Sequence, residues 1–378
     1  MAKNVLLLGA GATTGSGGTC EINGARFTPP VDNNFFETVS QHAPDLLSEN
    51  NRPFLRTLLS SFDIRFSETK DFSGIRLEQV WSFVDLCFKH FLPGKYTFVK
   101  EHNKCNELIK RINQGAKDSH HYYQDYMNPR DINKAVWLML VLAGWEMRTL
   151  ISDVLGRIIV PSDNNFLKLF GKLQGECKGQ AIAVITFNYD LALEKSLDLS
   201  NDLRGRWHYP FIFSSTTRGE GVKIIKLHGS LNWKSTGPNL TNIDTDYLLE
   251  PVPQKINKTE CSQAAIIPPT ALKEEINLPK DQPPILQGLF NSLWRLALEE
   301  ISSADNLIII GYSFPLLDAH ADWLFRIATS GRSKFQEVIY CYKNSSRSED
   351  LERKVRRLFP ARSFTGYYQG FDQFVNSN

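Results

Sequence analysis

The sequence predicts an α/β protein built on a doubly wound parallel sheet, with a helical insertion domain after the first strand. Two observations carry this prediction. Short apolar runs recur along the chain, and they are continuous rather than alternating, as in strands that are buried on both faces. Segments with helical spacing of apolar residues lie between the later runs, so strands and helices alternate.

The predicted strands are short and lie far apart in the chain. The first covers residues 4–8 and leads directly into a glycine-rich loop. The later strands cover residues 181–186, 222–227, 307–310 and 338–341. Each run has the length of a buried strand, which favours a single parallel sheet.

Helical periodicity occurs in two parts of the chain. Residues 285–301 place apolar side chains three and four positions apart, and residues 315–327 form a second helix with Pro315 in its first turn. Residues 77–88 and 133–150 are also helical, in a region with few strand signals. This region separates the first strand from all the others.

The length of 378 residues is sufficient for two domains. We expect one domain to be discontinuous and to contain the sheet, with residues 1–45 and 180–378. The other is the helical insertion, with residues 46–179.

Composition and charge exclude several classes of function. Lys plus Arg number 43 and Asp plus Glu 41, so the formal net charge of +2 gives no basis for direct nucleic-acid binding. The six cysteines form no CxxC pair, so we expect no zinc module and no metal site. The longest apolar stretch, residues 135–145, is too short for a membrane helix, which needs about 20 residues. We expect a cytoplasmic protein with reduced thiols.

A glycine loop follows the first strand. Gly9, Ala10 and Gly11 would let a pyrophosphate approach the backbone, and the hydroxyls of Thr13 and Thr14 could add donors. The GxGxxG pattern requires glycine where Thr14 stands, so the loop alone is a weak signal. A glycine-rich turn between strand and helix is the alternative.

Asn188 and Asp190 follow the strand at residues 181–186. The amide of Asn188 can both donate and accept hydrogen bonds, so it could hold a ribose hydroxyl or a water molecule. Asp190 could instead cap the next helix, because Asp is a preferred N-cap residue. The two roles are compatible.

His228 and Gly229 follow the strand at residues 222–227. His228 is the best candidate for a general base, because the unperturbed pKa of histidine is close to neutrality. A structural histidine is the alternative. The histidine pair at residues 120–121 does not follow a predicted strand, and we expect it to lie in a polar loop at the surface.

Gly311, Tyr312 and Ser313 follow the strand at residues 307–310 and form a turn suited to close contact with a nucleotide. The alternative is an ordinary turn in which Ser313 caps a helix and Pro315 occupies its first position. Four strand ends of this kind would converge on one crevice in a parallel sheet.

In this order, the four blocks resemble the motifs of the sirtuin-like family. These motifs are a GAG loop, an N-x-D after a strand, an HG pair and a later glycine–serine turn, here at residues 9–11, 188–190, 228–229 and 311–313. The segments TFNYD, KLHGS and GYSFP, together with Asp318 and residues 266–270, are similar to sequences of the bacterial branch of the family that acts in anti-phage defence.

The resemblance implies a Rossmann-like domain that binds NAD. Sirtuins that deacylate proteins usually carry a zinc module and a Gln before the catalytic Asn, whereas this chain has no CxxC pair and has Phe187 at that position. The resemblance therefore implies that the protein hydrolyses NAD to nicotinamide and ADP-ribose, so that NAD is its substrate. It also implies that the protein is a regulated defence effector and that it binds no zinc. A protein deacylase or ADP-ribosyl transferase, and a non-catalytic sensor or scaffold that binds NAD or ADP-ribose, are the alternatives.

Within this resemblance, Asn188 would orient water and ribose hydroxyls, and His228 would act as base. Residues 9–11 and Thr13 would contact the pyrophosphate, and residues 311–313 the adenosine half. Asp190 would brace the turn that carries Asn188. The resemblance also implies a homo-oligomer and a possible partner, a HerA-type hexameric ATPase.

Overall fold

The computed structural model describes most of the chain. The described residues are 2–60, 72–86, 132–176, 182–210, 221–236, 242–244, 249–252, 255–256, 261–266, 285–315, 318–331, 334–343 and 348–377. All four strand-end blocks of the candidate site lie within these ranges. The histidine pair at residues 120–121 and the motif residues 267–270 lie outside them.

The largest sheet that the structure describes has seven strands. In chain order its strands are β1 (Asn4–Leu8), β5 (Ile182–Thr186), β6 (Trp207–His208), β7 (Val222–Lys226), β12 (Asn306–Ile310), β13 (Phe335–Cys341) and β14 (Ala361–Tyr367). Their order across the sheet is β14-β13-β12-β1-β5-β7-β6, and every neighbouring pair is parallel. The predicted doubly wound parallel sheet is therefore confirmed.

The strand order reverses at the centre of the sheet. From β1 the chain runs to β5 and β7 on one side, then returns to β12 on the other side of β1 and continues outward to β13 and β14. In open α/β sheets, ligands bind beyond the carboxyl ends of the strands at such a switch point. Gly9 and Gly311 are the residues that directly follow β1 and β12.

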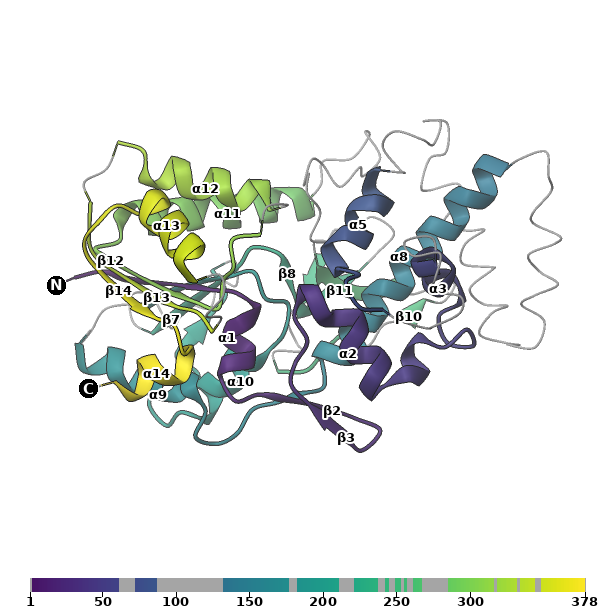
Figure 1. Ribbon diagram of the computed structural model, residues 1–378, viewed down its shortest axis with the longest axis horizontal. Coiled ribbons are helices and arrows are strands. Elements are labelled where there is room, and N and C mark those ends of the chain that lie inside the picture. Colours follow the sequence, from purple (N-terminus) through teal and green to yellow (C-terminus); the bar gives the residue numbers. More distant parts are fainter. Residues whose placement is uncertain are drawn as a thin grey trace.

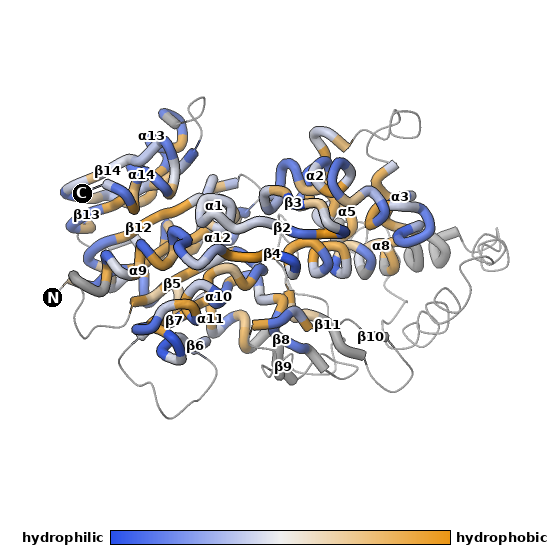
Figure 2. Tube along the Cα trace, turned by 90° about the horizontal axis from the view of Figure 1, so that it is seen from below, coloured by the Kyte–Doolittle hydropathy of each residue, from blue (hydrophilic) through white to orange (hydrophobic). Residues whose placement is uncertain are grey.

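Helices cover both faces of the sheet, as Figure 1 shows. One layer contains α11 (Ile285–Ser303), α12 (Ala319–Thr329) and α13 (Ser348–Leu358), and the opposite layer contains α9 (Asn165–Glu176), α10 (Ala192–Leu199) and α14 (Phe371–Asn376). The short helix α1 (Ala10–Gly15) follows β1 directly. In Figure 2, strands β5 and β12 are coloured as hydrophobic, which agrees with their burial between the two layers.

The remaining elements lie beside the sheet. They are η1 (Asp32–Asn34), α2 (Phe35–His42), η2 (Pro44–Leu47), α3 (Pro53–Ser60), α5 (Leu77–Leu86) and α8 (Ile132–Leu155). Two small antiparallel sheets belong to this group. The first consists of β2 (Thr19–Ile22), β3 (Ala25–Phe27) and β4 (Ile158–Ile159). The second consists of β8 (Gly229–Thr236), β9 (Asn242–Asp244), β10 (Lys255–Ile256) and β11 (Cys261–Ile266). Helices α3 and α5 pack on α8, whereas α9 packs on α10 and α14 beneath the main sheet. The division of the chain into two domains stays a prediction.

One predicted helix begins later than expected. The pattern placed its start at Pro315, with Ser313 as a possible cap, but α12 begins at Ala319. Asp318 is its N-cap, and the carboxylate accepts a hydrogen bond from the Ala321 N–H. The side chain of Asp318 therefore sets the start of the helix, and Gly311 to Pro315 form an extended turn before it.

Among the helices that the structure describes, none has both the length and the apolar character needed to cross a membrane.

A buried glutamate joins α8 to the start of α3. Glu146 is 4% exposed, and its Oε2 accepts a hydrogen bond of 2.7 Å from the backbone N–H of Leu55 in the first turn of α3. Burial raises the pKa of Glu146 to about 8, against the opposing effects of this N–H donor and of the nearby Arg52 guanidinium. Arg52 is itself paired with Asp153, which offsets its positive charge.

This pKa predicts how stability depends on pH. Between the ordinary pKa of 4.5 and about 8, the unfolded chain has released the Glu146 proton while the folded protein keeps it, so stability falls as pH rises through this window. Glu146→Gln keeps the acceptor for Leu55 and removes the ionisable group. We expect its free energy of unfolding, relative to the wild type, to rise by roughly 2–5 kcal/mol from pH 4.5 to pH 8. Denaturant titrations at several pH values measure this.

Glu49→Gln is the control, because the side chain of Glu49 is exposed. Its stability difference from the wild type should stay constant over the same pH range. Parallel profiles for Glu146→Gln and the wild type would contradict the assignment.

Candidate functional site

Two glycine turns pack directly on each other at the switch point. Gly9 N–H donates to Ile310 O at 3.0 Å, and Gly11 N–H donates to Gly311 O at 3.0 Å. A Cβ on Gly9 would lie 2.6 Å from Gly311 O, and one on Gly311 would lie 2.1 Å from Ala12 N. Gly311 also has a φ of +63°, which favours glycine. The protein backbone therefore requires these glycines, independently of a ligand.

These bonds change what the glycine loop can offer. The N–H groups of Gly9 and Gly11 already donate to backbone carbonyls, whereas Ala10 is the first residue of α1 and is exposed. The first N–H of a helix has no acceptor within the helix. Of the three residues predicted to contact a pyrophosphate, Ala10 is thus the best placed to donate its N–H.

Asn188 is tied to this loop by both hydrogens of its amide. Nδ2 donates to Gly9 O at 2.9 Å and to Thr13 Oγ1 at 3.1 Å. Thr13 in turn donates its hydroxyl proton to Asp190 Oδ2 at 2.9 Å. Since the NH₂ group is fixed by two oxygens, the orientation of the carboxamide is fixed too, and its Oδ1 is the atom left to accept from a ligand or a water.

The two predicted threonine donors differ in their surroundings. Thr13 is buried, and its one hydroxyl proton is bound by Asp190, so donation to a ligand would require this bond to break. Thr14 is half-buried and makes only long hydrogen bonds, of 3.5 Å to Ala10 O and 3.3 Å to Pro29 O. Thr14 is therefore the more available hydroxyl of the pair.

Asp190 lies one residue before Leu191, the N-cap of α10, and its carboxylate binds two other segments. Its Oδ1 accepts the N–H of Ala192, the first residue of α10, at 3.0 Å, while Oδ2 accepts the hydroxyl of Thr13. Burial raises the pKa of Asp190, and the charge of Lys226 and these hydrogen bonds act in the opposite direction. One carboxylate thus binds both the first N–H of α10 and the Thr13 hydroxyl, although Asp190 is not the N-cap residue that the sequence suggested.

His228 lies in an aromatic environment on the other side of the β5 end. Its ring is 6% exposed and lies 5.1 Å from the ring of Phe187 and 6.1 Å from that of Tyr189, measured between centroids. Its Nε2 is 3.9 Å from Asp318 Oδ2, which also accepts the hydroxyl of Tyr312 at 3.0 Å. A carboxylate at this distance would stabilise the imidazolium that forms when His228 takes up a proton.

The structure thus brings the predicted blocks together around the end of β5. Asn188 contacts Gly9 and Thr13, whereas the rings of its neighbours Phe187 and Tyr189 pack on His228. Tyr312 joins the set, since its ring is stacked on Phe187 at 4.6 Å. Ser313 is exposed. A direct cooperation of Asn188 with His228 stays a prediction.

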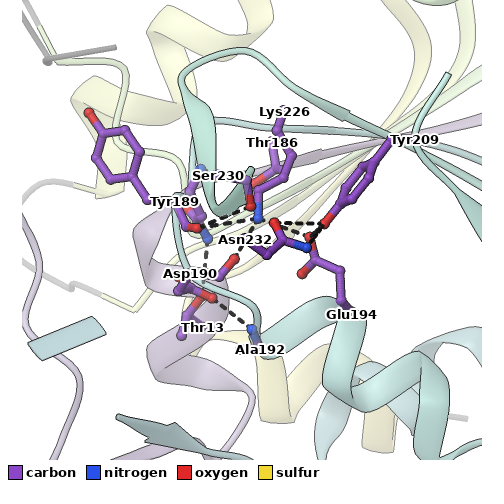
Figure 3. A network of polar contacts seen from close by, with 11 residues as sticks. Thr13, Thr186, Tyr189, Asp190, Ala192, Glu194, Tyr209, Lys226, Ser230 and Asn232 are labelled. Carbon is purple, nitrogen blue, oxygen red and sulfur yellow. Dashed lines mark hydrogen bonds and ion pairs between the residues drawn. The ribbon is translucent and has the colours of Figure 1, made fainter. Parts of the chain in front are cut away.

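Sequence reasoning missed a buried ion pair below this turn. Lys226 ends β7, and its Nζ lies 2.9 Å from Oε1 of Glu194 on α10; both side chains are 1% exposed. Figure 3 shows the pair among Tyr209, Asn232 and the turn residues. A lysine at the end of a strand that is predicted to be buried was the available signal, but its partner lies 32 positions away in sequence. In the described ranges, no group of three or more His, Cys, Asp or Glu side chains is placed to hold a metal ion.

Comparison with known proteins identifies one matching family. The family model of the SIR2-like domain matches residues 182–358, slightly less than half of the chain. No relative is found among curated protein sequences. The matching solved structures include one that describes the structural basis of sirtuin substrate affinity, with 15% identity, a TM-score of 0.38 and coverage of 99% of this chain and 91% of the other. A complex of a Sir2 homologue with NAD shows 14% identity, a TM-score of 0.37 and coverage of 99% and 88%.

The packing of the glycine turns leads to a paired prediction. Gly311→Ala forces a Cβ into the backbone of α1 as well as straining φ, so we expect a loss of roughly 2–5 kcal/mol in the free energy of unfolding. Gly331 has a similar φ of +74° but no atom within 4 Å of the added Cβ. Gly331→Ala should therefore cost only the backbone strain, about 1–2 kcal/mol. Chemical denaturation of both variants measures this; equal losses would show that the contact of the turns is unimportant.

Proposed function

We propose that this chain hydrolyses NAD to nicotinamide and ADP-ribose, as a regulated anti-phage defence effector that depletes the NAD of the cell. The observation that carries the proposal is the meeting of four blocks at the switch point of the sheet. There the Asn188 carboxamide is held by the glycine loop, and His228 lies beside Asp318. The match to the SIR2-like domain over residues 182–358 supports it.

The chemistry requires little more than positioning. The bond that breaks joins C1′ of the ribose to the nicotinamide nitrogen, and its electron pair leaves with nicotinamide, which becomes neutral. Water then forms the new bond to C1′ and gives up a proton. Since the transition state resembles an oxocarbenium ion, the protein has to hold the dinucleotide, orient the ribose and supply the water.

The geometry supports a division of roles. The Oδ1 of Asn188 would accept a hydrogen bond from the attacking water or from a ribose hydroxyl, because its NH₂ group is already bound by Gly9 and Thr13. His228 would accept the proton, and Asp318 would stabilise the resulting imidazolium. The N–H of Ala10 would contact the pyrophosphate, and the Gly311 turn would contact the adenosine half.

Two properties of the assembly are also proposed, on the resemblance of the motifs alone. These are a homo-oligomeric state and association with a HerA-type hexameric ATPase. Mass measurement of the chain, alone and mixed with such an ATPase, tests both. A monomer under both conditions would contradict them.

Asn188→Ala and His228→Ala should abolish cleavage of NAD while the chain stays folded. General base catalysis contributes typically about 10²–10⁴-fold, so we expect nicotinamide release to fall by at least about 10²-fold in His228→Ala, with a similar loss in Asn188→Ala. Chromatography of the products measures the rate, and circular dichroism verifies folding. Asn201→Ala is the control, because Asn201 is exposed and lies beyond the C-terminal end of α10, whereas Asn188 lies before the start of this helix. Release at the wild-type rate would remove either residue from the catalytic set.

The alternatives are separated by one incubation of the wild-type chain with NAD, with and without an acyl-peptide or protein acceptor and the ATPase. Release of nicotinamide and ADP-ribose without an acceptor supports the hydrolase. Turnover only with an acceptor supports a deacylase or an ADP-ribosyl transferase. Binding of NAD or ADP-ribose in calorimetry, without turnover in any mixture, supports a sensor or scaffold.

A further inference from the structure

A single buried ammonium group links three parts of the fold beneath the candidate site. Lys226 Nζ donates to Oε1 of Glu194 at 2.9 Å, and the same nitrogen donates to the backbone carbonyls of Tyr189, at 3.4 Å, and Asp190. These two carbonyls belong to the residues that directly follow Asn188. Lys226 therefore ties the turn at residues 188–190 to the end of β7 and to α10, as Figure 3 shows.

The same oxygen of the Glu194 carboxylate accepts a second hydrogen bond. Tyr209 donates its hydroxyl to Oε1 at 2.8 Å, and Asn232 Nδ2 donates to the Tyr209 oxygen at 3.0 Å. The second oxygen, Oε2, is buried and has no hydrogen-bond partner within the part of the chain that the structure describes. An arrangement that leaves a buried carboxylate oxygen unpaired is poor as a stabilising device, because burying a charge costs more than an imperfect pair returns.

The turn, in contrast, is held at each of its residues. The Tyr189 carbonyl also accepts the Leu231 N–H at 3.0 Å. The side chain of Asp190 binds Thr13, whose oxygen accepts from Asn188 Nδ2. A continuous chain of hydrogen bonds therefore runs from Lys226 through the backbone and side chain of Asp190 to the carboxamide of Asn188.

We propose that Lys226 and Glu194 are positioning residues, a buried ion pair whose role is to hold the 188–190 turn so that the Asn188 carboxamide keeps its orientation. This inference rests on the proposed function for its kinetic consequence, but not for its structural one. Both side chains are 1% exposed, so a bound substrate would not reach them. Apolar or neutral replacement of a complete buried pair is often tolerated by the fold, so positioning and stability can be separated.

The test variant is Lys226→Met combined with Glu194→Gln. It removes both charges at similar volume, and Gln keeps an acceptor for the Tyr209 hydroxyl. The matched control is Lys223→Met combined with Glu300→Gln, because Lys223 lies in the same strand and pairs with Glu300 at 2.7 Å, away from the turn. Both variants are compared with the wild type in thermal unfolding, hydrogen exchange and nicotinamide release.

We expect the backbone amides of residues 187–192 to exchange at least about tenfold faster in the test variant, with those of β12 unchanged. We also expect kcat to fall at least about tenfold, while KM changes less than about threefold, because an orientation needed in the transition state is lost. The control variant should change neither quantity. Should the double variant not fold, Glu194→Gln alone is measured, with smaller changes expected in the same direction.

Wild-type exchange at residues 187–192 together with wild-type kcat, in a folded test variant, would overturn the proposal. So would an equal effect of the control variant on these amides. A wild-type chain that releases no nicotinamide would overturn the proposed hydrolase instead, and the exchange measurement would still decide whether the pair holds the turn.

Discussion

The contact between the two glycine turns determines where everything else at the site lies. Because Gly11 donates to Gly311 and neither residue has a side chain, the ends of β1 and β12 come within backbone distance of each other. Helix α1 therefore starts immediately beside the switch point, and Thr13 reaches Asp190 across the end of β5. A larger residue in either turn would separate α1 from the sheet and break this connection.

Most polar groups near the switch point are bound to one another rather than left for a ligand. A line of hydrogen bonds runs from Asn188 through Thr13 to Asp190. The Asp190 carbonyl continues it to the buried pair of Lys226 and Glu194. In a buried site such bonds are strong, and they fix the geometry before a ligand binds. In the proposed function, the Asn188 Oδ1 would then act on a substrate without reorganisation.

The inner strands of the main sheet could be predicted from the sequence, whereas the polar connections could not. Apolar runs located β1, β5, β7, β12 and β13, because strands buried on both faces are rich in apolar residues. The edge strands β6 and β14 and the strands of the two small sheets were missed, and both edge strands are only partly buried. Helix α12 was placed too early because the N-cap depends on which side chain, Ser313 or Asp318, accepts the first N–H groups. The Lys226–Glu194 pair joins residues 32 positions apart, which only the folded chain brings together.

Phe187 shows how a departure from the motif of the deacylating sirtuins changes the division of work at the site. Its ring is stacked on Tyr312 at 4.6 Å and meets the ring of His228 edge to face at 5.1 Å. An aromatic side chain at this position has no hydrogen-bond donor or acceptor for a ribose, and its ring packs against the histidine instead. In the proposed function, the polar contacts to the ribose would therefore come from Asn188 and His228. The proposed transfer to water would need one fixed acceptor and one base, and these two side chains can supply them.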